Sequence, residues 1–590
     1  MTTSPLADPY DARLALGVTG PLAELNRAGV LEAADVHVAR RVTALAGDDD
    51  PLVALAVAVA VRAVRSGSVC VRLAEVAAEE ESGTTWPDPG VWQAAVAASP
   101  LVSGPALLHL EGDRLYLDRY WREELQVCDD LLSRPRDEVA GEPTGLARVF
   151  PAEGYDEQRA AAALAVTQST TVLTGGPGTG KTTAVAGLLA LLAQAAEEAG
   201  DPAPRIGLAA PTGKAAARLE QAVRGEVAKL PDPADRARLD GLTAMTLHRL
   251  LGSRPDTSAR FRHHRDNRLP HDVVVVDETS MVSLTMMARL LEALRPEARL
   301  VLVGDPDQLA SVEAGAVLAD MVDGLGQRDD VRIARLATSH RFGRTIGALA
   351  AAIRDGDDEE VVTLLRRGDE NLEFIETDAP AEPLRDLLLP RALGLREAAQ
   401  VGEADRALAL LDQHRLLCAH REGPFGVRHW NRQVERWLSE ETGEGIWSDW
   451  YPGRPFLVTA NDYGLGIFNG DAGVAVGAAG DLRAHVAAVG GAIDLSPARV
   501  SDVDTLHAMT IHKSQGSQAR EVTVLLPDPD SRLLTRELLY TAVTRAEKLI
   551  RVVGTEESVR AAVRRQVRRA SGLAERLRAG QGNTAATADD

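Results

Sequence analysis

The segment Gly175-Gly-Pro-Gly-Thr-Gly-Lys181-Thr182 carries the clearest chemical signal in this sequence. An apolar, β-branched run precedes it, and an apolar stretch with helical spacing follows it. Glycines at this spacing let backbone N–H groups wrap a phosphate, and the start of a helix adds a favourable dipole. The lysine suits β- and γ-phosphates, and the threonine hydroxyl suits Mg²⁺. We therefore expect a nucleotide site formed by Gly175, Gly176, Pro177, Gly178, Thr179, Gly180, Lys181, Thr182 and Thr183.

Two carboxylates end a second apolar run, Val273-Val-Val-Val-Asp277-Glu278. Asp277 is placed to hold the Mg²⁺ shell together with Thr182, and Glu278 to polarise the attacking water. Strands often end in acids, so this pair alone indicates little. Downstream of the glycine-rich loop, it predicts hydrolysis of a nucleoside triphosphate. A glycine-rich turn without a ligand is the alternative, and the flanking strand and helix argue against it.

Short apolar runs that alternate with helical patterns must position these groups. One set lies within residues 171–304 and a second within 372–553, which predicts an α/β fold with two domains of buried parallel strands. A glycine-rich, β-patterned stretch with Asn469-Gly470 as a hairpin signal lies inside the second set. The expected strands are 171–175, 206–210, 273–277, 300–304, 372–376, 415–419, 522–526 and 549–553.

Composition narrows the class of protein. The 590 residues carry a net charge of −21, so any nucleic-acid contact must be a local groove rather than the whole surface. The three cysteines, Cys70, Cys128 and Cys418, form no C-x-x-C pair, which argues against a disulfide framework or a cysteine-rich zinc site. The first residues show no signal-peptide pattern, and no uncharged apolar run is long enough to span a membrane. We expect a cytoplasmic protein.

Seven further motifs occur in a fixed order: LAAPTGKAAARL (208–219), TLHRLL (246–251), DETSM (277–281), GDPDQLASV (304–312), SHRFG (339–343), MTIHKSQGSQ (509–518) and LYTAVTRA (539–546). As a set they resemble the motif series of superfamily 1 DNA helicases, and most closely the RecD family, the alpha subunit of exodeoxyribonuclease V. The resemblance covers about residues 155–555. It implies two RecA-like P-loop motor domains, a mostly helical N-terminal domain and a small SH3-like β insertion.

The domain boundaries follow from the resemblance and from changes in composition. The N-terminal region is rich in Ala, Val and Leu and carries no catalytic motif, so it would expose apolar faces unless it docked on a partner. The expected divisions are a helical partner-docking domain at 1–110, a linker at 111–150, a first motor domain at 151–335 with a basic pin at 253–271, a second motor domain at 336–555 with the SH3-like insertion at about 455–505, and an arginine-rich helix with a disordered tail at 556–590.

The resemblance assigns roles to further side chains near the nucleotide. Gln158 matches the glutamine that reads adenine, because an amide can pair with adenine N6 and N7. Gln308 would sit between the γ-phosphate and the DNA and report the nucleotide state. Arg341 and Arg545 match two arginines that the second motor domain presents to the γ-phosphate. Glu537 is a candidate for orienting Arg545. For each of them, an ordinary surface or loop side chain is the alternative.

Small hydroxyl, histidine and lysine residues at loop ends are the candidates for DNA contact. Such groups suit sequence-independent phosphate contacts and stacking, and ordinary loop residues are the alternative. They are Pro211, Thr212, Lys214, Thr246, His248, Thr510, His512, Lys513 and Ser514. The basic segment 253–271 indicates either a strand-contacting pin or a solvated loop. For a cluster of four tryptophans we favour a place in the core over base stacking: Trp430, Trp437, Trp447 and Trp450.

The resemblance implies an ATP-driven 5′–3′ DNA helicase that uses ATP and Mg²⁺. It would be the alpha motor subunit of a RecBCD-type enzyme that processes double-strand DNA ends with RecB-like and RecC-like partners. The sequence shows no acid–acid–lysine nuclease constellation, so nuclease chemistry is expected on a partner. The rivals are a stand-alone RecD-like helicase, a P-loop switch without translocation and a catalytically idle scaffold. The ordered second-domain motifs argue against the switch, and intact Lys181, Glu278 and Arg341 argue against the scaffold.

Overall fold

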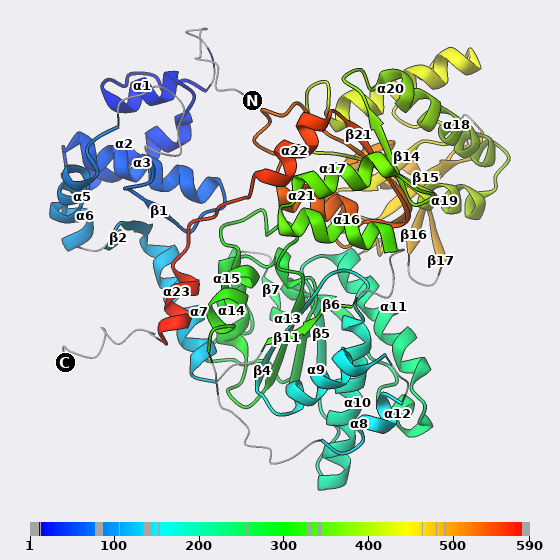
Figure 1. Ribbon diagram of the computed structural model, residues 1–590, viewed down its shortest axis with the longest axis horizontal. Coiled ribbons are helices and arrows are strands. Elements are labelled where there is room, and N and C mark those ends of the chain that lie inside the picture. The colour runs from blue at the N-terminus through cyan, green and yellow to red at the C-terminus, as the bar shows by residue number, and fades with distance from the viewer. Residues whose placement is uncertain are drawn as a thin grey trace.

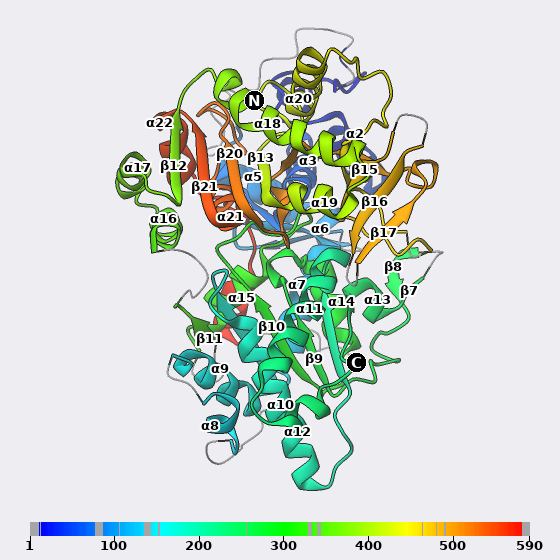
Figure 2. The same ribbon diagram turned by 90° about the vertical axis from the view of Figure 1, so that its right-hand side faces the viewer.

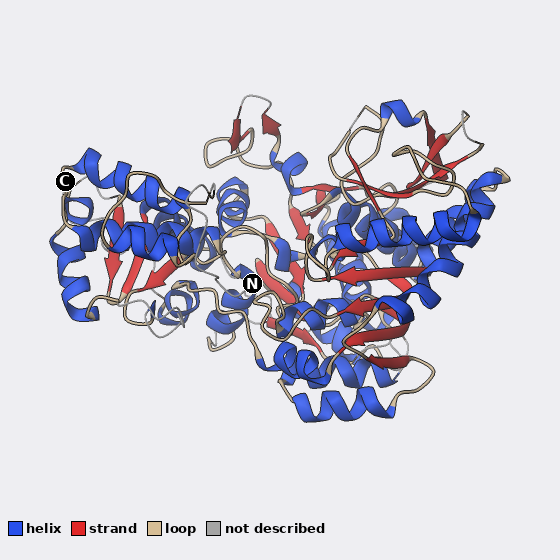
Figure 3. Cartoon of the chain, turned by 90° about the horizontal axis from the view of Figure 1, so that it is seen from above, coloured by secondary structure: helices blue, strands red, loops and turns tan. Residues whose placement is uncertain are grey.

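The chain forms an N-terminal domain and two α/β domains, and the two α/β domains face each other across a cleft (Figure 1). In that view the N-terminal domain lies to the left, the first α/β domain below and the second above. Figure 3, from above, shows the N-terminal domain set apart from the α/β domains. The computed structural model describes residues 11, 13–76, 86–104, 107–134, 143–151, 154–254, 257–328, 333–338, 344–462, 464–478, 481–488 and 491–580.

The N-terminal domain packs helices against a small antiparallel sheet. Its elements are α1 (Pro21–Arg27), α2 (Ala33–Ala46), α3 (Pro51–Arg65), β1 (Cys70–Arg72), α5 (Pro89–Ala98), α6 (Pro100–Ser103), β2 (Leu108–Glu111) and β3 (Arg114–Leu117), with strand order β1-β3-β2. Helix α3 is apolar on almost every side, and residues from Leu55 to Ala60 are at most 2% exposed. Asp50 caps it by accepting the N–H of Leu52, and Pro51 occupies its first turn. The mostly helical character expected here is confirmed.

The first α/β domain has a six-stranded parallel sheet with helices on both faces. Its elements are α8 (Leu146–Val149), α9 (Asp156–Val166), β4 (Thr170–Gly175), α10 (Lys181–Ala199), β5 (Ile206–Ala210), α11 (Gly213–Lys229), α12 (Pro233–Arg238), β6 (Ala244–Thr246), α13 (Leu247–Leu251), β9 (Val273–Val276), η1 (Thr279–Met281), α14 (Leu284–Ala293), β10 (Arg299–Gly304), α15 (Val317–Leu325) and β11 (Ile333–Leu336). The strand order is β11-β4-β10-β9-β5-β6. Because both faces are covered, the strands read as continuous apolar runs.

A two-stranded hairpin, β7 (Ser253–Arg254) and β8 (Thr257–Phe261), follows α13. It stands out from the body of the molecule in two perpendicular views (Figures 2 and 3). Phe261 is buried at its base, and the ring of His248 meets it edge-on at 5.8 Å. Arg265, just beyond, pairs with Asp130 at 2.9 Å. The segment 253–271 therefore forms a projecting hairpin, which is the shape expected of a pin.

The second α/β domain has a five-stranded parallel sheet. Its elements are α16 (Arg344–Asp355), α17 (Asp358–Arg367), β12 (Leu372–Glu376), α18 (Ala381–Gln400), α19 (Ala404–Gln413), β13 (His414–Cys418), α20 (Val427–Thr442), β19 (Ala508–Thr510), η3 (His512–Ser514), β20 (Ala519–Leu525), α21 (Arg536–Val543), β21 (Ala546–Gly554) and α22 (Glu556–Arg564). The strand order is β12-β21-β20-β13-β19.

A separate antiparallel sheet is inserted between α20 and β19 (Figure 2). Its elements are β14 (Pro455–Val458), β15 (Ala472–Val476), β16 (Arg483–Ala488), β17 (Gly491–Leu495), η2 (Pro497–Arg499) and β18 (Val503–Thr505), in the order β17-β16-β15-β14-β18. Phe456 and Val486 are fully buried in its own small core. The insertion therefore has a small core of its own, while Leu457 and Val474 on β14 and β15 join the core of the second α/β domain.

The segment 111–150 is not a linker along its whole length, which corrects the division expected from the sequence. Its first residues form β3 in the N-terminal sheet, and α7 (Asp118–Leu132) follows directly. Helix α7 is amphipathic and lies against α14 of the first α/β domain, with Val127 and Cys128 fully buried. A helix with one apolar stripe gains stability by covering a neighbouring face. The N-terminal domain is thereby joined to the first α/β domain by packing.

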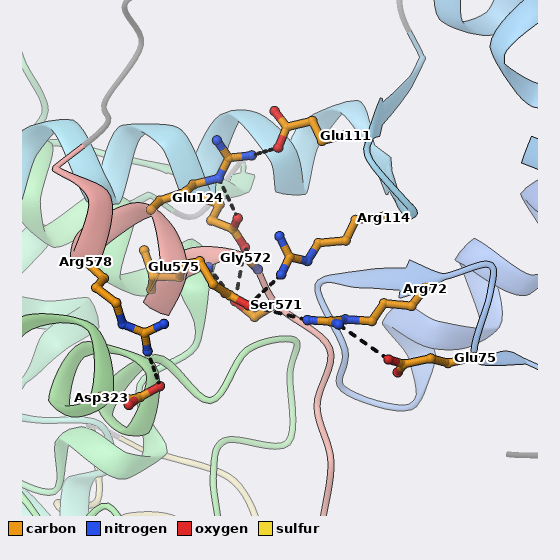
Figure 4. A network of polar contacts seen from close by, with 12 residues as sticks. Arg72, Glu75, Glu111, Arg114, Glu124, Asp323, Ser571, Gly572, Glu575 and Arg578 are labelled. Atoms are coloured by element: carbon orange, nitrogen blue, oxygen red, sulfur yellow. Dashed lines mark hydrogen bonds and ion pairs between the residues drawn. The ribbon is translucent and has the colours of Figure 1, made fainter. Parts of the chain in front are cut away.

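The C-terminal segment returns from the second α/β domain to the other two domains (Figure 4). The carbonyl of Ala570 accepts the backbone N–H of Val69 at 2.8 Å, at the start of the N-terminal sheet. The buried carboxylate of Glu124 on α7 accepts the Ser571 hydroxyl, the Gly572 N–H and Nε of Arg576. The last described helix, α23 (Leu573–Ala579), then lies on α15. The expected tail at 581–590 lies outside the described residues.

The tryptophan cluster divides three to one. Trp430 and Trp437 are 2% and 5% exposed in the core behind α20. Trp450 is partly buried and meets Phe456 edge-on at 5.2 Å. Trp447 is 94% exposed. The expected core position is confirmed for Trp430, Trp437 and Trp450 and is wrong for Trp447.

Candidate nucleotide cleft and DNA-facing loops

The glycine-rich loop joins the end of β4 to the start of α10, as the sequence predicts. Gly178 and Gly180 have φ angles of 81° and 84°, a left-handed conformation that side chains disfavour. These turns bring the loop back over the first turn of the helix, where backbone N–H groups have no partner within the helix. The ammonium of Lys181 donates to the carbonyls of Gly175 and Gly176 at 2.6 and 2.9 Å. The loop is therefore already shaped to surround an anion.

Predicted nucleotide residues from distant parts of the chain meet in one cavity of about 980 Å³. It opens at the interface of the two α/β domains, so both contribute to its walls. Most of the predicted set lines it: Gln158, Pro177, Gly178, Gly180, Lys181, Thr182, Thr183, Asp277, Glu278, Gln308 and Arg545. Gly175, Gly176 and Thr179 lie on the other side of the same loop, against a second cavity. Arg341 lies outside the described residues.

Three acids end the central strands next to the loop. Burial raises the pKa of Asp277, and the adjacent charge of Glu278 raises it further. Burial also raises the pKa of Asp305, at the end of β10. Glu278 has a φ of 51°, and it is the one non-glycine residue with positive φ in the described part of the chain. Such backbone strain persists where a side chain must be held in one place.

A chain of hydrogen bonds crosses the cleft from Asp305. Its Oδ2 accepts Nε2 of Gln308 at 3.0 Å and the hydroxyl of Tyr540 at 3.0 Å. Oε1 of Gln308 in turn accepts Nη2 of Arg545 at 3.0 Å. Gln308 and Arg545 are 6% and 3% exposed, so these contacts are shielded from water. Asp305 and Tyr540 were missed in the sequence, although both lie inside quoted motifs.

Arg545 is oriented by other groups than the one expected. Its Nε donates to the carbonyl of Thr541 at 3.0 Å, on the preceding turn of α21. The carboxylate of Glu537 accepts the backbone N–H of Val567 at 3.1 Å instead, in the C-terminal segment. The position of Arg545 therefore follows from its own helix and from Gln308.

Gln158 lies beneath the glycine-rich loop. It is 1% exposed, and its Nε2 donates to the carbonyl of Thr179 at 2.8 Å. Its Oε1 is buried and has no hydrogen-bond partner among the described residues. A Cβ at Gly180 would stand 2.6 Å from Nε2, so the amide and the loop fit closely. Gln158 therefore supports the loop through one end of its amide, and the reading of adenine stays a prediction.

Arg218 is a third residue that sequence reasoning missed, after Asp305 and Tyr540. It lines the cavity from α11 of the first α/β domain. Its guanidinium donates to the carbonyl of Gly516 at 2.9 Å and to Oε1 of Gln518 at 2.9 Å, both in the second domain. In a chain with 65 Lys and Arg residues, this arginine differs from surface ones in the sequence only by its place in the motif LAAPTGKAAARL.

Two of the predicted DNA contacts on the first domain are helix caps. Thr212, directly after Pro211, accepts the N–H of Ala215 at 3.2 Å at the start of α11. Thr246 accepts the N–H of Arg249 at 3.2 Å at the start of α13. Strands β5 and β6 are parallel neighbours, so both helix starts lie at the same edge of the sheet. The exposed ring of His248 follows at this edge.

The predicted DNA residues of the second domain lie in one tight turn after β19. Thr510 accepts the N–H of Lys513 at 3.2 Å, and the buried Ser514 donates to the carbonyl of Ile511 at 2.6 Å. His512 is half-buried, and burial lowers its pKa. The ammonium of Lys513 lies 2.7 Å from a carboxylate oxygen of Asp504. The two hydroxyls therefore shape the turn, while His512 and Lys513 remain nearer the surface.

Lys214 connects the first domain to the β insertion. Its ammonium donates to the carbonyl of Gly470 at 3.0 Å. Burial lowers the pKa of Lys214 to about 8, with smaller contributions from Arg415 and Arg218. Next to it, a Cβ at Gly213 would stand 2.7 Å from Cβ of Phe468. The insertion thus lies directly over one of the motifs assigned to DNA.

Comparisons with known proteins agree with this geometry. Family models match an AAA domain at 158–314, a UvrD-like helicase C-terminal domain at 505–553 and the N-terminal domain of RecBCD enzyme subunit RecD at 27–116. RecBCD enzyme subunit RecD of Mycobacterium tuberculosis is 62% identical over 569 residues, which cover 96% of this chain and 98% of that protein. The chain belongs to the RecD family.

Two further members of this RecD group extend the comparison. RecBCD enzyme subunit RecD of Mycolicibacterium smegmatis is 63% identical over 552 residues, covering 93% of this chain and 98% of that protein. The ATP-dependent RecD2 DNA helicase of Deinococcus radiodurans is 32% identical over 490 residues, covering 82% of this chain and 61% of that protein.

Membership of the RecD family makes this chain an ATP-dependent DNA helicase of superfamily 1, with two RecA-like domains. The large cavity between those domains is accordingly the candidate nucleotide cleft. The rival hypothesis of a P-loop switch without translocation is therefore wrong. None of the described helices is long and apolar enough to cross a membrane.

Proposed function

We propose that this chain is the 5′–3′ motor of a RecBCD-type helicase–nuclease that processes double-strand DNA ends in the cytoplasm. The observation that carries the motor role is the hydrogen-bond chain from Asp305 through Gln308 to Arg545. It links the nucleotide side of the first domain to the second domain by side chains rather than by loose contact. In this proposal, binding or loss of the γ-phosphate changes the orientation of one α/β domain relative to the other.

The residues of the cleft fit ATP with Mg²⁺. Mg²⁺ prefers oxygen ligands, and the Thr182 hydroxyl and the Asp277 carboxylate are such donors at the base of the loop. When bound, the ion neutralises charge on the phosphates. Lys181 exchanges the two loop carbonyls for β- and γ-phosphate oxygens. Glu278 orients the attacking water, and Arg545, together with Arg341, stabilises charge that develops during transfer.

A second set of contacts connects the nucleotide site to the turn at residues 510–514, which we call the DNA turn. Nε2 of Gln515 donates to the carbonyl of Leu309, and the N–H of Leu309 donates to the hydroxyl of Thr541 at 2.9 Å. Leu309 directly follows Gln308, and Gln515 directly follows the turn that holds Thr510 to Ser514. A shift of the Gln308 loop therefore moves the DNA turn of the opposite domain. This coupling is what a ratchet along single-stranded DNA requires.

The N-terminal domain supplies the partner surface in this proposal. Val38 and Leu45 lie two turns apart on the same face of α2, and they are 42% and 69% exposed. Aliphatic side chains left in solvent on one helix face favour a protein partner. We assign this face to a RecC-like subunit and nuclease chemistry to a RecB-like subunit. The stand-alone RecD-like helicase remains the rival.

The test is assembly of the complex from co-expressed subunits. We expect the double variant Val38→Asp/Leu45→Asp to lose copurification with the RecC-like subunit. Its DNA-stimulated ATPase should persist, because α2 is remote from the cleft. Leu533→Asp, at a 44% exposed leucine of the second α/β domain, is the matched control and should assemble normally. Normal assembly of the double variant, or a stable processive monomer that unwinds from a 5′ tail, would refute the partnership.

A further inference from the structure

One aromatic side chain of the second α/β domain is held out in solvent. Trp447 is 94% exposed in the loop after α20. Indoles usually contribute to folding by burial. Because this indole lies in solvent, it adds little to the core. Its ring edge lies over Gly445, where a Cβ would stand 2.5 Å from Nε1. One edge of the ring therefore lies close to the backbone, and the rest of its surface is open to solvent.

Trp447 belongs to a hollow of about 380 Å³. Helix α20 contributes Arg428, Asn431 and Arg432 to its lining, and β18 contributes Asp504. Most of the lining is polar, unlike a groove that buries an apolar helix or strand of a partner protein. The hollow lies outside the nucleotide cleft and shares no residue with it.

The cations of the hollow are available at its surface. Arg421 and Arg432 are exposed, and neither has an ion-pair partner among the residues that the structure describes. Arg428 is paired with Glu422 at 2.6 Å. In a chain of net charge −21, two unpaired arginines beside an exposed indole mark a local site for an anion.

Two of the three acids in the lining are held by neighbouring groups. Asp504 is held by Lys513, with the two charged atoms 2.7 Å apart. Glu435 accepts the Tyr451 hydroxyl at 3.1 Å, and burial raises the pKa of its carboxyl. Asp449 is the remaining carboxylate in the lining. Arg421 and Arg432 therefore remain the cations of the lining that are open to an anion.

The hollow is bonded to the DNA turn. The amide of Asn431 donates to the carbonyl of Thr505 and accepts the N–H of Ala508, both at 2.8 Å. These two residues begin the segment that enters β19 and the turn with His512. The ion pair between Asp504 and Lys513 joins the lining to the same turn. The lining of the hollow and this turn are therefore held together by direct contacts.

We propose that this hollow binds single-stranded DNA, with a nucleobase stacked on Trp447 and neighbouring phosphates beside Arg421 and Arg432. The inference rests on the helicase function and extends the DNA track beyond the motif residues. Stacking accepts every base because each has a π-face, so the site suits a motor that ignores sequence. It gives the second α/β domain a grip on the strand next to its DNA turn.

The test uses the full chain and an oligodeoxythymidine of about 20 nucleotides, long enough to span both domains. We expect Trp447→Ala to weaken its affinity about 10-fold and Trp447→Phe, which keeps a stacking ring, to weaken it less. Arg421→Gln/Arg432→Gln should also weaken binding and reduce the salt dependence. Arg406→Gln, at an exposed arginine of α19 outside the hollow, is the charge control. An oligonucleotide carrying 5-iodouracil should crosslink to the peptide that contains Trp447.

The outcomes separate this inference from the helicase function. Unchanged affinity in the Trp447 and double arginine variants, with normal DNA-stimulated ATPase, would overturn the hollow and leave the helicase intact. A wild-type chain without single-stranded DNA binding would instead count against the helicase function. Trp447→Ala with normal DNA affinity but lost copurification of a RecB-like or RecC-like subunit would make the hollow a protein-docking face and overturn the proposal. Thermal unfolding should be unchanged in all variants, because the substituted side chains are exposed.

Discussion

The candidate nucleotide cleft and the candidate DNA face, which consists of the DNA-facing loops described above, use their motif residues in different ways. In the cleft, the side chains themselves converge: Lys181, Asp277 and Gln308 line one cavity. On the DNA face, the hydroxyls of Thr212 and Thr246 are turned back to cap the helices that they begin. What such a motif offers to a phosphate is then the backbone N–H groups of a helix start rather than the hydroxyl itself.

The difference follows from the two tasks. Hydrolysis needs particular charges at fixed points, so its residues cannot be exchanged without loss. A motor track must accept any sequence, and backbone N–H groups with a helix dipole hold a phosphate without reading a base. A motif can therefore be equally recognisable in both places while its side chains do chemistry in one and shape the backbone in the other.

The largest effect is expected in the cleft. Lys181→Ala should lower DNA-stimulated ATPase by about 10³-fold or more, because it removes the phosphate-facing cation. Glu278→Gln should keep ATP binding and stall hydrolysis to a similar extent, since the amide cannot polarise water. The assay is phosphate release with saturating oligonucleotide, and Lys548→Ala, at an exposed lysine, is the control. Normal turnover in Lys181→Ala would end the assignment of the cleft.

A smaller effect is expected on the DNA face, and it tests the cap directly. Thr212→Ala should cost about 1 kcal/mol of stability by removing the cap, and weaken single-stranded DNA binding a few-fold. Thr212→Asn caps equally well, so it should restore both properties. Thermal unfolding and oligonucleotide affinity are measured on the same samples. If Thr212→Ala weakens affinity without lowering stability, the hydroxyl itself binds DNA and the contrast with the cleft disappears.

The smallest effect concerns pH at Lys214. Its pKa is lowered to about 8, so its ammonium loses the proton as the pH rises through 8, whereas an ordinary lysine keeps it to about 10.4. Single-stranded DNA affinity should therefore fall about 2- to 5-fold between about pH 7 and pH 9. Lys214→Arg should show no such fall, because a guanidinium stays charged. Equal pH profiles for the two proteins would exclude Lys214 from the track.

Local sequence was sufficient where neighbouring residues determine the structure. The loop from Gly175 to Thr182 lies between a strand and a helix as predicted, because its glycines, flanking runs and cap all act within a few residues. The basic composition of 253–271 left a pin and a solvated loop open, and the structure places a hairpin at its start. Such features need no knowledge of distant contacts.

The rest depends on contacts between distant parts of the chain. Tyr540 meets Asp305 across the cleft, and Arg218 meets Gln518 in the same way. Helix α7 looked like a linker because its apolar stripe has meaning only against α14. Trp447 was assigned to the core with the other three tryptophans because tryptophans in an aromatic-poor chain more often fill a core, and nothing local separates it from them. Periodicity gives the face of an element but not the partner that covers it.

The return of the C-terminal segment has a consequence for synthesis of the chain. Leu573 and Leu577 of α23 are fully buried in the same core as Val69, Val317 and Met321. The N-terminal and first α/β domains leave the ribosome long before these leucines are made. Their shared core therefore lacks these two leucines, and leaves apolar surface exposed, until α23 has been synthesised. Completion of this core comes after synthesis of the second α/β domain, and a chain that stops before α23 leaves that surface to chaperones or aggregation.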